Sequence, residues 1–108
     1  STDQHLILKN FNERLRSLKF YINLYEITPI FITQIRFDGL KNNNLFLINE
    51  KLKNFCVKNS YYIIPLDELI NQLDINDFYD EIHTTISGSD KIAKSIYLPI
   101  KNILEKYY

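Results

Sequence analysis

The stretch Pro29-Ile-Phe-Ile-Thr-Gln-Ile35 decides the fold class that we expect for this chain. It is short, β-branched and aromatic, and it is apolar at successive positions, so both of its faces are suited to burial. This pattern predicts a buried strand, with a parallel neighbour favoured over an antiparallel one. Tyr61-Tyr-Ile-Ile64, closed by Pro65, predicts a second short strand.

Helices are expected before, between and after these strands. Apolar residues at spacings of three and four predict an amphipathic helix that ends at Thr28-Pro29: Leu8, Phe11, Leu15, Leu18, Ile22 and Tyr25. A second helix should run from Asn42–Asn44 to Asn59-Ser60, with an inner stripe of Leu45, Ile48, Leu52, Phe55 and Cys56. A last helix should run from near Thr85 towards Tyr107, with a kink at Pro99.

The remaining segments predict shorter features: a loop at Arg36–Gly39, a short helix at Leu66–Leu73 and a polar loop at Asp74–Thr84. Helices that alternate with short buried strands indicate an α/β fold with a parallel sheet and helices on both faces. Two strands buried on both faces need further strands beside them. We therefore expect residues 1–108 to form a single domain that is the trailing part of a larger one.

Composition excludes several classes of protein. The 108 residues are 45% hydrophobic and 24% charged, which is typical of a globular chain. Formal net charge is zero and the basic residues are spread out, so nucleic acid is not an expected partner. No apolar run approaches the ~20 residues that span a bilayer. With a single cysteine, Cys56, the chain has no internal disulfide. We expect a soluble protein, either cytoplasmic or exported with its signal removed.

Residues 77–83 are the only place where carboxylates crowd a histidine. Asp80 precedes His83 by three residues, just ahead of the last expected helix. A serine hydrolase needs a base for the hydroxyl proton and a carboxylate that orients this base. Histidine suits the first task because its unperturbed pKa is ~6.5. The same spacing also fits a solvated or helix-capping cluster, and spacing alone leaves both interpretations open.

The string from Asp77 to Ala93 resembles the final conserved block of SGNH/GDSL hydrolases. That block has Asp, two residues, His, a Thr/Asn/Ser cap, a Gly and an Ala-containing helix. Pro29–Gln34 and Tyr61–Asp67 look like the family's preceding strands, so the resemblance covers roughly residues 6–104. It implies the C-terminal part of a three-layer α/β/α flavodoxin-like fold with parallel strands. It also implies hydrolysis of O-acyl esters by a Ser-His-Asp triad, on a small-molecule, carbohydrate or lipid ester.

Carried over by position, the resemblance makes His83 the general base and Asp80 its orienting partner. Thr85 would cap the last helix, and Gly88 would allow that helix to pack closely. Asp77 and Glu81 do not match the motif, so they receive no catalytic role. The resemblance implies neither a cofactor nor a metal.

The chain departs from the family in lacking a Gly-Asp-Ser-type nucleophile block and the family's oxyanion donors. Its serines are expected in helices (Ser17, Ser95), at a strand start (Ser60) or in the motif's own helix (Ser87, Ser89). A missing N-terminal half or a second chain would have to supply the nucleophile. The 108-residue chain alone is therefore expected to be inactive. Arg36 to Lys41 is the only candidate for a substrate-shaping loop.

Two other functions remain open: an inactive α/β binding or structural module that kept the fold, and a small interaction domain in which Asp-x-x-His is coincidental. A thiol–imidazole pair of Cys56 and His83 is disfavoured because Cys56 lies on the inner stripe. A metal site built from His5, His83 and an Asp lacks ligand spacing. Two glycines, Gly39 and Gly88, are too few for a phosphate-binding loop.

Overall fold

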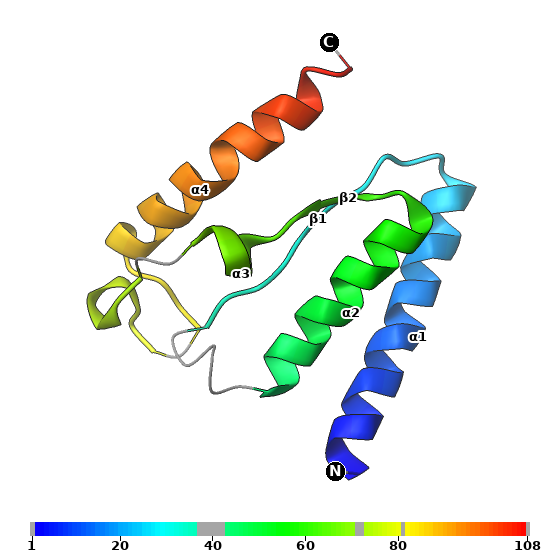
Figure 1. Ribbon diagram of the computed structural model, residues 1–108, viewed down its shortest axis with the longest axis horizontal. Helices are drawn as coiled ribbons and strands as arrows, with labels where there is room; N and C mark the ends of the chain where they lie inside the picture. Colours follow the sequence, from blue (N-terminus) through cyan, green and yellow to red (C-terminus); the bar gives the residue numbers. More distant parts are fainter. Residues whose placement is uncertain (1, 37–42, 71–72, 81, 108) are drawn as a thin grey trace.

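The computed structural model describes residues 2–36, 43–70, 73–80 and 82–107 (Figure 1). Its elements follow the order α1 (Thr2–Leu24), β1 (Ile30–Ile32), α2 (Asn43–Asn59), β2 (Tyr62–Ile64) and α3 (Leu66–Leu69). A 3₁₀ turn, η2 (Ile75–Asp77), and a long helix, α4 (Ile86–Leu104), complete the chain. The three long helices that the sequence predicts are present. The first differs from the expectation, because α1 ends at Leu24 and because Leu18 and Tyr25 of its expected inner stripe are exposed. Pro99 lies inside α4.

The strands pair in parallel, with Ile30 opposite Tyr62 and Ile32 opposite Ile64. In Figure 1 they lie between α2 and α4, and α1 lies on the outer side of α2. Both strands are three residues long, shorter than expected. Of their residues, Ile64 alone is buried, and the others are half-buried.

The core lies where α1, α2 and the strands meet. Leu15, Leu52 and Cys56 are buried at its centre, and half-buried side chains pack around them: Phe11, Phe31, Phe55, Tyr61 and Ile63. Phe31, Phe55 and Tyr61 form an aromatic cluster with ring centroids 5.6–6.0 Å apart. Such aromatic pairs hold α2 against β1 and β2.

The expected three-layer α/β/α flavodoxin-like fold is wrong for this chain. The structure is mostly helical (67%), and the sheet of the described residues has two short strands. The apolar runs are strands, as expected, but among the described residues no third strand pairs with either edge. The chain is a flat slab of 45 × 42 × 18 Å with a radius of gyration of 15.2 Å. A compact domain of this length would have a radius of about 13 Å.

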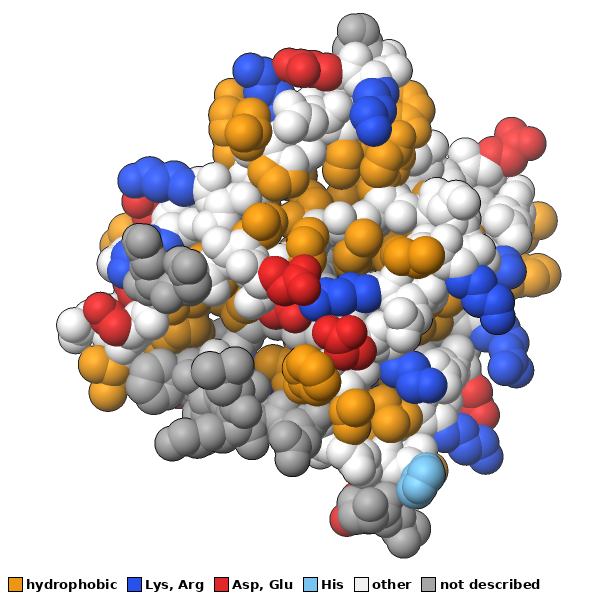
Figure 2. Space-filling model, in the orientation of Figure 1, with side chains coloured by type: hydrophobic (Ala, Val, Ile, Leu, Met, Phe, Trp, Pro, Cys, Tyr) orange, Lys and Arg blue, Asp and Glu red, His pale blue; other side chains and the backbone are white. Residues whose placement is uncertain are grey.

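Large apolar side chains remain on the surface of this slab. Figure 2 shows hydrophobic side chains gathered between α4 and the strands. A groove along α4 is lined mainly by Ala93, Ile96, Tyr97, Ile100 and Leu104. The last turns of α1 expose Phe20, Tyr21 and Leu24, and Tyr25 directly after the helix is exposed as well. Within the described ranges, no helix is long and apolar enough to cross a membrane.

The shorter features differ in detail from the expectation. The short helix ends at Leu69 rather than Leu73, and the loop Asp74–Thr84 contains the turn η2. Most of the Arg36–Gly39 loop, and with it the proposed substrate-shaping segment up to Lys41, lies outside the described residues.

Candidate functional site

The segment between η2 and α4 is a small loop closed at its base. The backbone N–H of Thr85 donates to the carbonyl of Asp77 at 2.9 Å. One step further in, Phe78 and Thr84 form an antiparallel bridge, and the N–H of Tyr79 donates to the carbonyl of His83 at 2.8 Å. The tip of the loop is therefore held by its own backbone.

Asp80 and His83 meet at this tip, as their spacing predicts. His83 Nδ1 lies 2.7 Å from Asp80 Oδ2. The other oxygen, Asp80 Oδ1, accepts the backbone N–H groups of Ile82 at 2.9 Å and His83 at 2.8 Å. These donors, first that of Ile82 and then the His83 ring, lower the pKa of Asp80 to about 2. The carboxylate is therefore ionised at neutral pH and has a fixed orientation.

The tautomer of a neutral His83 follows from this contact. An ionised carboxylate only accepts hydrogen bonds, so Nδ1 must carry the proton and Nε2 must carry the lone pair. Among the described residues nothing bonds to Nε2, and the His83 side chain is 69% exposed. An oriented imidazole with a free basic nitrogen can take a proton from a group that approaches the loop.

The start of α4 agrees with the expectations for Thr85 and Gly88. Thr85 is the N-cap, and its hydroxyl accepts the N–H of Gly88 at 3.2 Å. A Cβ at Gly88 would lie 2.2 Å from the carbonyl oxygen of Asp77. Only glycine lets α4 approach η2 this closely, which confirms both sequence predictions.

The five serines that the structure describes do not supply a nucleophile at this loop. Three of them lie inside α4, where the hydroxyl of Ser87 bonds to Asp77, that of Ser89 to Thr84 and that of Ser95 to a backbone carbonyl. Ser17 lies in α1, and Ser60 follows α2 with a φ of 58°. None of the five lies at a strand-to-helix elbow, in agreement with the sequence analysis.

Thiol and metal chemistry find no support in the described part of the chain. Cys56 is fully buried, and burial raises the pKa of its thiol to about 11, which makes it inert at neutral pH. The described residues contain no group of three or more His, Cys, Asp or Glu side chains that could hold a metal ion.

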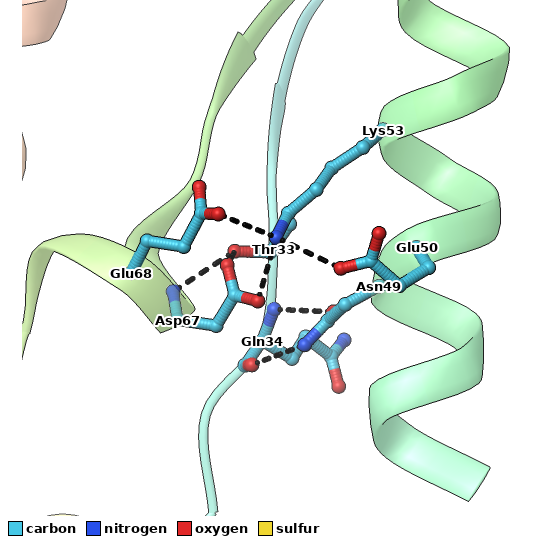
Figure 3. Close-up of polar contacts among 7 residues, drawn as sticks. All are labelled: Thr33, Gln34, Asn49, Glu50, Lys53, Asp67 and Glu68. Carbon is cyan, nitrogen blue, oxygen red and sulfur yellow. Dashed lines mark hydrogen bonds and ion pairs between the residues drawn. The ribbon is translucent and has the colours of Figure 1, made fainter.

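A polar cluster at the carboxyl ends of the two strands was not foreseen (Figure 3). Thr33 Oγ1 donates to Asp67 Oδ1 at 2.6 Å and accepts the N–H of Asp67 at 3.0 Å. Lys53 Nζ lies 2.9 Å from Asp67 Oδ2, with Glu50 and Glu68 at 3.3 and 3.4 Å. Partial burial lowers the pKa of Lys53, but hydrogen bonds to Asp67 and Glu50 outweigh it and raise this pKa.

Asn49 completes this cluster because its side-chain amide bonds to both backbone groups of Gln34, as a neighbouring strand would. Its side-chain oxygen accepts the N–H of Gln34 at 3.1 Å, and its amide donates to the carbonyl of Gln34 at 2.9 Å. Every buried side-chain polar atom in the described residues has a partner. We assign the cluster a structural role, since Lys53 on α2 bonds to Asp67 on α3 and Asp67 bonds to Thr33 after β1.

Asp77 is a second feature whose importance the sequence analysis did not predict. Its side chain is buried and bonds to Ser87, Lys91 and the backbone of Asp74. These donors, Lys91 first, lower its pKa to about 2. A sequence signal existed: Asp74 and Asp77 have the three-residue spacing of a capping box, which the structure contains.

Comparisons with models of protein families, with curated proteins and with solved structures give no match to this chain.

Proposed function

We propose that this chain carries the base and the orienting carboxylate of a Ser-His-Asp hydrolase that cleaves O-acyl esters. The observation that supports the proposal is the 2.7 Å contact between His83 Nδ1 and Asp80 Oδ2, with Asp80 Oδ1 held by two backbone N–H groups. This is the arrangement that fixes the imidazole tautomer in such triads. The motif resemblance of residues 77–93 points to the same reaction.

The chemistry assigned to the pair is general base catalysis. Nε2 of His83 takes the proton of a serine hydroxyl as its oxygen attacks the ester carbonyl. The imidazolium is stabilised by Asp80, and it then returns the proton to the leaving alkoxide. In the second half, water attacks the acyl-serine and His83 again accepts and returns one proton. The reaction is a net hydrolysis and needs no cofactor.

The serine in this proposal comes from polypeptide outside residues 1–108, either of the same gene product or of a second chain. The described serines are all placed away from an elbow, as above. The surface also has room for further structure: the groove along α4 is apolar, and the strands are only half-buried. Large exposed apolar patches mark interaction surfaces, and contact with further polypeptide is one such use. The oxyanion donors would come from the same segment.

The test is labelling of the longest native gene product with a fluorophosphonate serine probe. The proposal expects one labelled serine outside residues 1–108, and it expects labelling to be lost in His83→Ala. The matched control is His5→Ala, which removes the other histidine, an exposed one on α1, and should leave labelling unchanged. Absence of labelling in the wild type overturns the proposal in favour of an inactive binding module. Labelling that persists in His83→Ala overturns the assignment of His83 as the base.

A further inference from the structure

Asp77 is an unusual carboxylate for a surface loop. It is 1% exposed and ends the turn η2. Its Oδ1 accepts the hydroxyl of Ser87 at 2.6 Å, and its Oδ2 accepts Lys91 Nζ at 2.7 Å and the N–H of Asp74 at 2.9 Å. A buried charge with three donors is stable only in one orientation, because each lost partner leaves the charge less compensated.

The backbone of Asp77 is also held in place. Its carbonyl accepts the N–H of Thr85, and the absence of a side chain at Gly88 lets α4 lie directly against it. Asp77 and Thr85 thus form the base of the loop that carries Asp80 and His83. From this base the Phe78–Thr84 bridge and the bond from Tyr79 N–H to the His83 carbonyl lead to the tip.

We infer that Asp77, clamped by Ser87 and Lys91, is the residue that positions the Asp80–His83 pair. The catalytic meaning of this role rests on the proposed function, but the positioning itself is a property of the loop. Ser87 and Lys91 of α4 orient the Asp77 side chain, and the Asp77 carbonyl holds Thr85 at the base of the loop. The Phe78–Thr84 bridge and the bond from Tyr79 N–H to the His83 carbonyl then orient the imidazole. Asp77 is thus a positioning residue and does not touch the reacting atoms.

A purely structural role would predict something different. If Asp77 only stabilises the junction of η2 and α4, a folded Asp77→Asn chain would keep its His83–Asp80 bond, because that bond is local to residues 80–83. If Asp77 positions the pair, the folded variant loses the fixed imidazole. The tautomer of His83 is therefore the quantity that separates the two roles.

The experiment is nitrogen-15 NMR of the histidine rings in the full chain, at a pH where the imidazoles are neutral. We expect the wild type to have His83 in the Nδ1–H form, and Asp80→Asn and Asp77→Asn to lose this preference. His5, exposed on α1, is the internal reference. Asp90→Asn is the matched control, since it removes an α4 carboxylate that pairs with Lys94. It should leave the His83 signal unchanged.

A folded Asp77→Asn chain with the wild-type His83 tautomer overturns the inference. If Asp77→Asn fails to fold by circular dichroism, Ser87→Ala decides in the same way, because it removes one of the three donors and keeps the carboxylate. Failure of the proposed function is distinguishable from failure of this inference. An unlabelled native product with an intact, Asp77-dependent tautomer refutes the hydrolase and leaves the positioning role standing.

Discussion

Gly88→Ala tests the closest approach in the structure. The added Cβ would lie 2.2 Å from the carbonyl oxygen of Asp77 and 3.1 Å from its carbonyl carbon. Real Cβ atoms essentially never come within 3.0 Å of such atoms, so the start of α4 must move away by roughly 1 Å. Both contact partners are backbone, so no side-chain rotation can relieve the clash. The 2.9 Å bond from Thr85 N–H to the Asp77 carbonyl should break with this movement.

The magnitude follows from three contributions. Overpacking costs about 1–3 kcal/mol, and the broken backbone bond about 1 kcal/mol. The better helix propensity of alanine returns about 1 kcal/mol. We expect the free energy of unfolding to fall by about 2 kcal/mol. The measurement is urea unfolding followed by circular dichroism.

The control is Lys94→Ala, an exposed position on the same helix, which should change stability by less than about 0.5 kcal/mol. A Gly88→Ala chain as stable as the wild type, or more stable, would show that α4 does not lie against Asp77 as described.

Three further results are expected. Asn49→Ala should lower stability by about 1–3 kcal/mol, since it removes two hydrogen bonds to the backbone of Gln34. Cys56 should react with a thiol reagent only after unfolding, because its thiol is buried and its pKa is about 11. Stability should hold down to about pH 5 and fall towards pH 2, since Asp77 and Asp80 have pKa values of about 2 in the fold against 3.8 ordinarily.

Each of these has its own check. Asn54→Ala, at an exposed position of α2, is the match for Asn49→Ala and should be nearly neutral. Fast modification of native Cys56 would contradict its burial. For the acid titration, the unfolded chain binds more protons between pH 2 and 4, so stability must rise with pH there. A melting temperature that does not change across this range would show that Asp77 and Asp80 lack their donors.

The sequence predicted the helices and the local geometry of the loop well. Apolar residues at spacings of three and four predicted α1, α2 and α4, although Leu18 and Tyr25 of the expected α1 stripe are exposed. The Asp80–His83 pair follows from a spacing of three, and the roles of Thr85 and Gly88 follow from helix-start chemistry. These are all short-range features, fixed within a few residues of the chain.

The long-range features were less accessible. The β1 run is apolar on both faces, so it predicts further strands beside it and helices over both faces. In the described residues the sheet has two strands, and β1 is only half-buried. Asn49 lies on α2, and its hydrogen bonds to Gln34 join residues 15 positions apart. They depend on how α2 packs against the segment after β1, which no local sequence pattern reports. The contact of Asp77 with Lys91 likewise joins η2 to the second turn of α4.

The rate of fluorophosphonate labelling in Asp80→Asn tests the central claim most directly. The substitution keeps the size of the side chain and removes the charge that fixes the His83 tautomer. For a working triad, loss of this carboxylate lowers turnover by about 10⁴-fold, so we expect labelling of the longest native product to slow by several orders of magnitude. A labelling rate equal to that of the wild type would contradict the assignment of Asp80 and His83 as orienter and base.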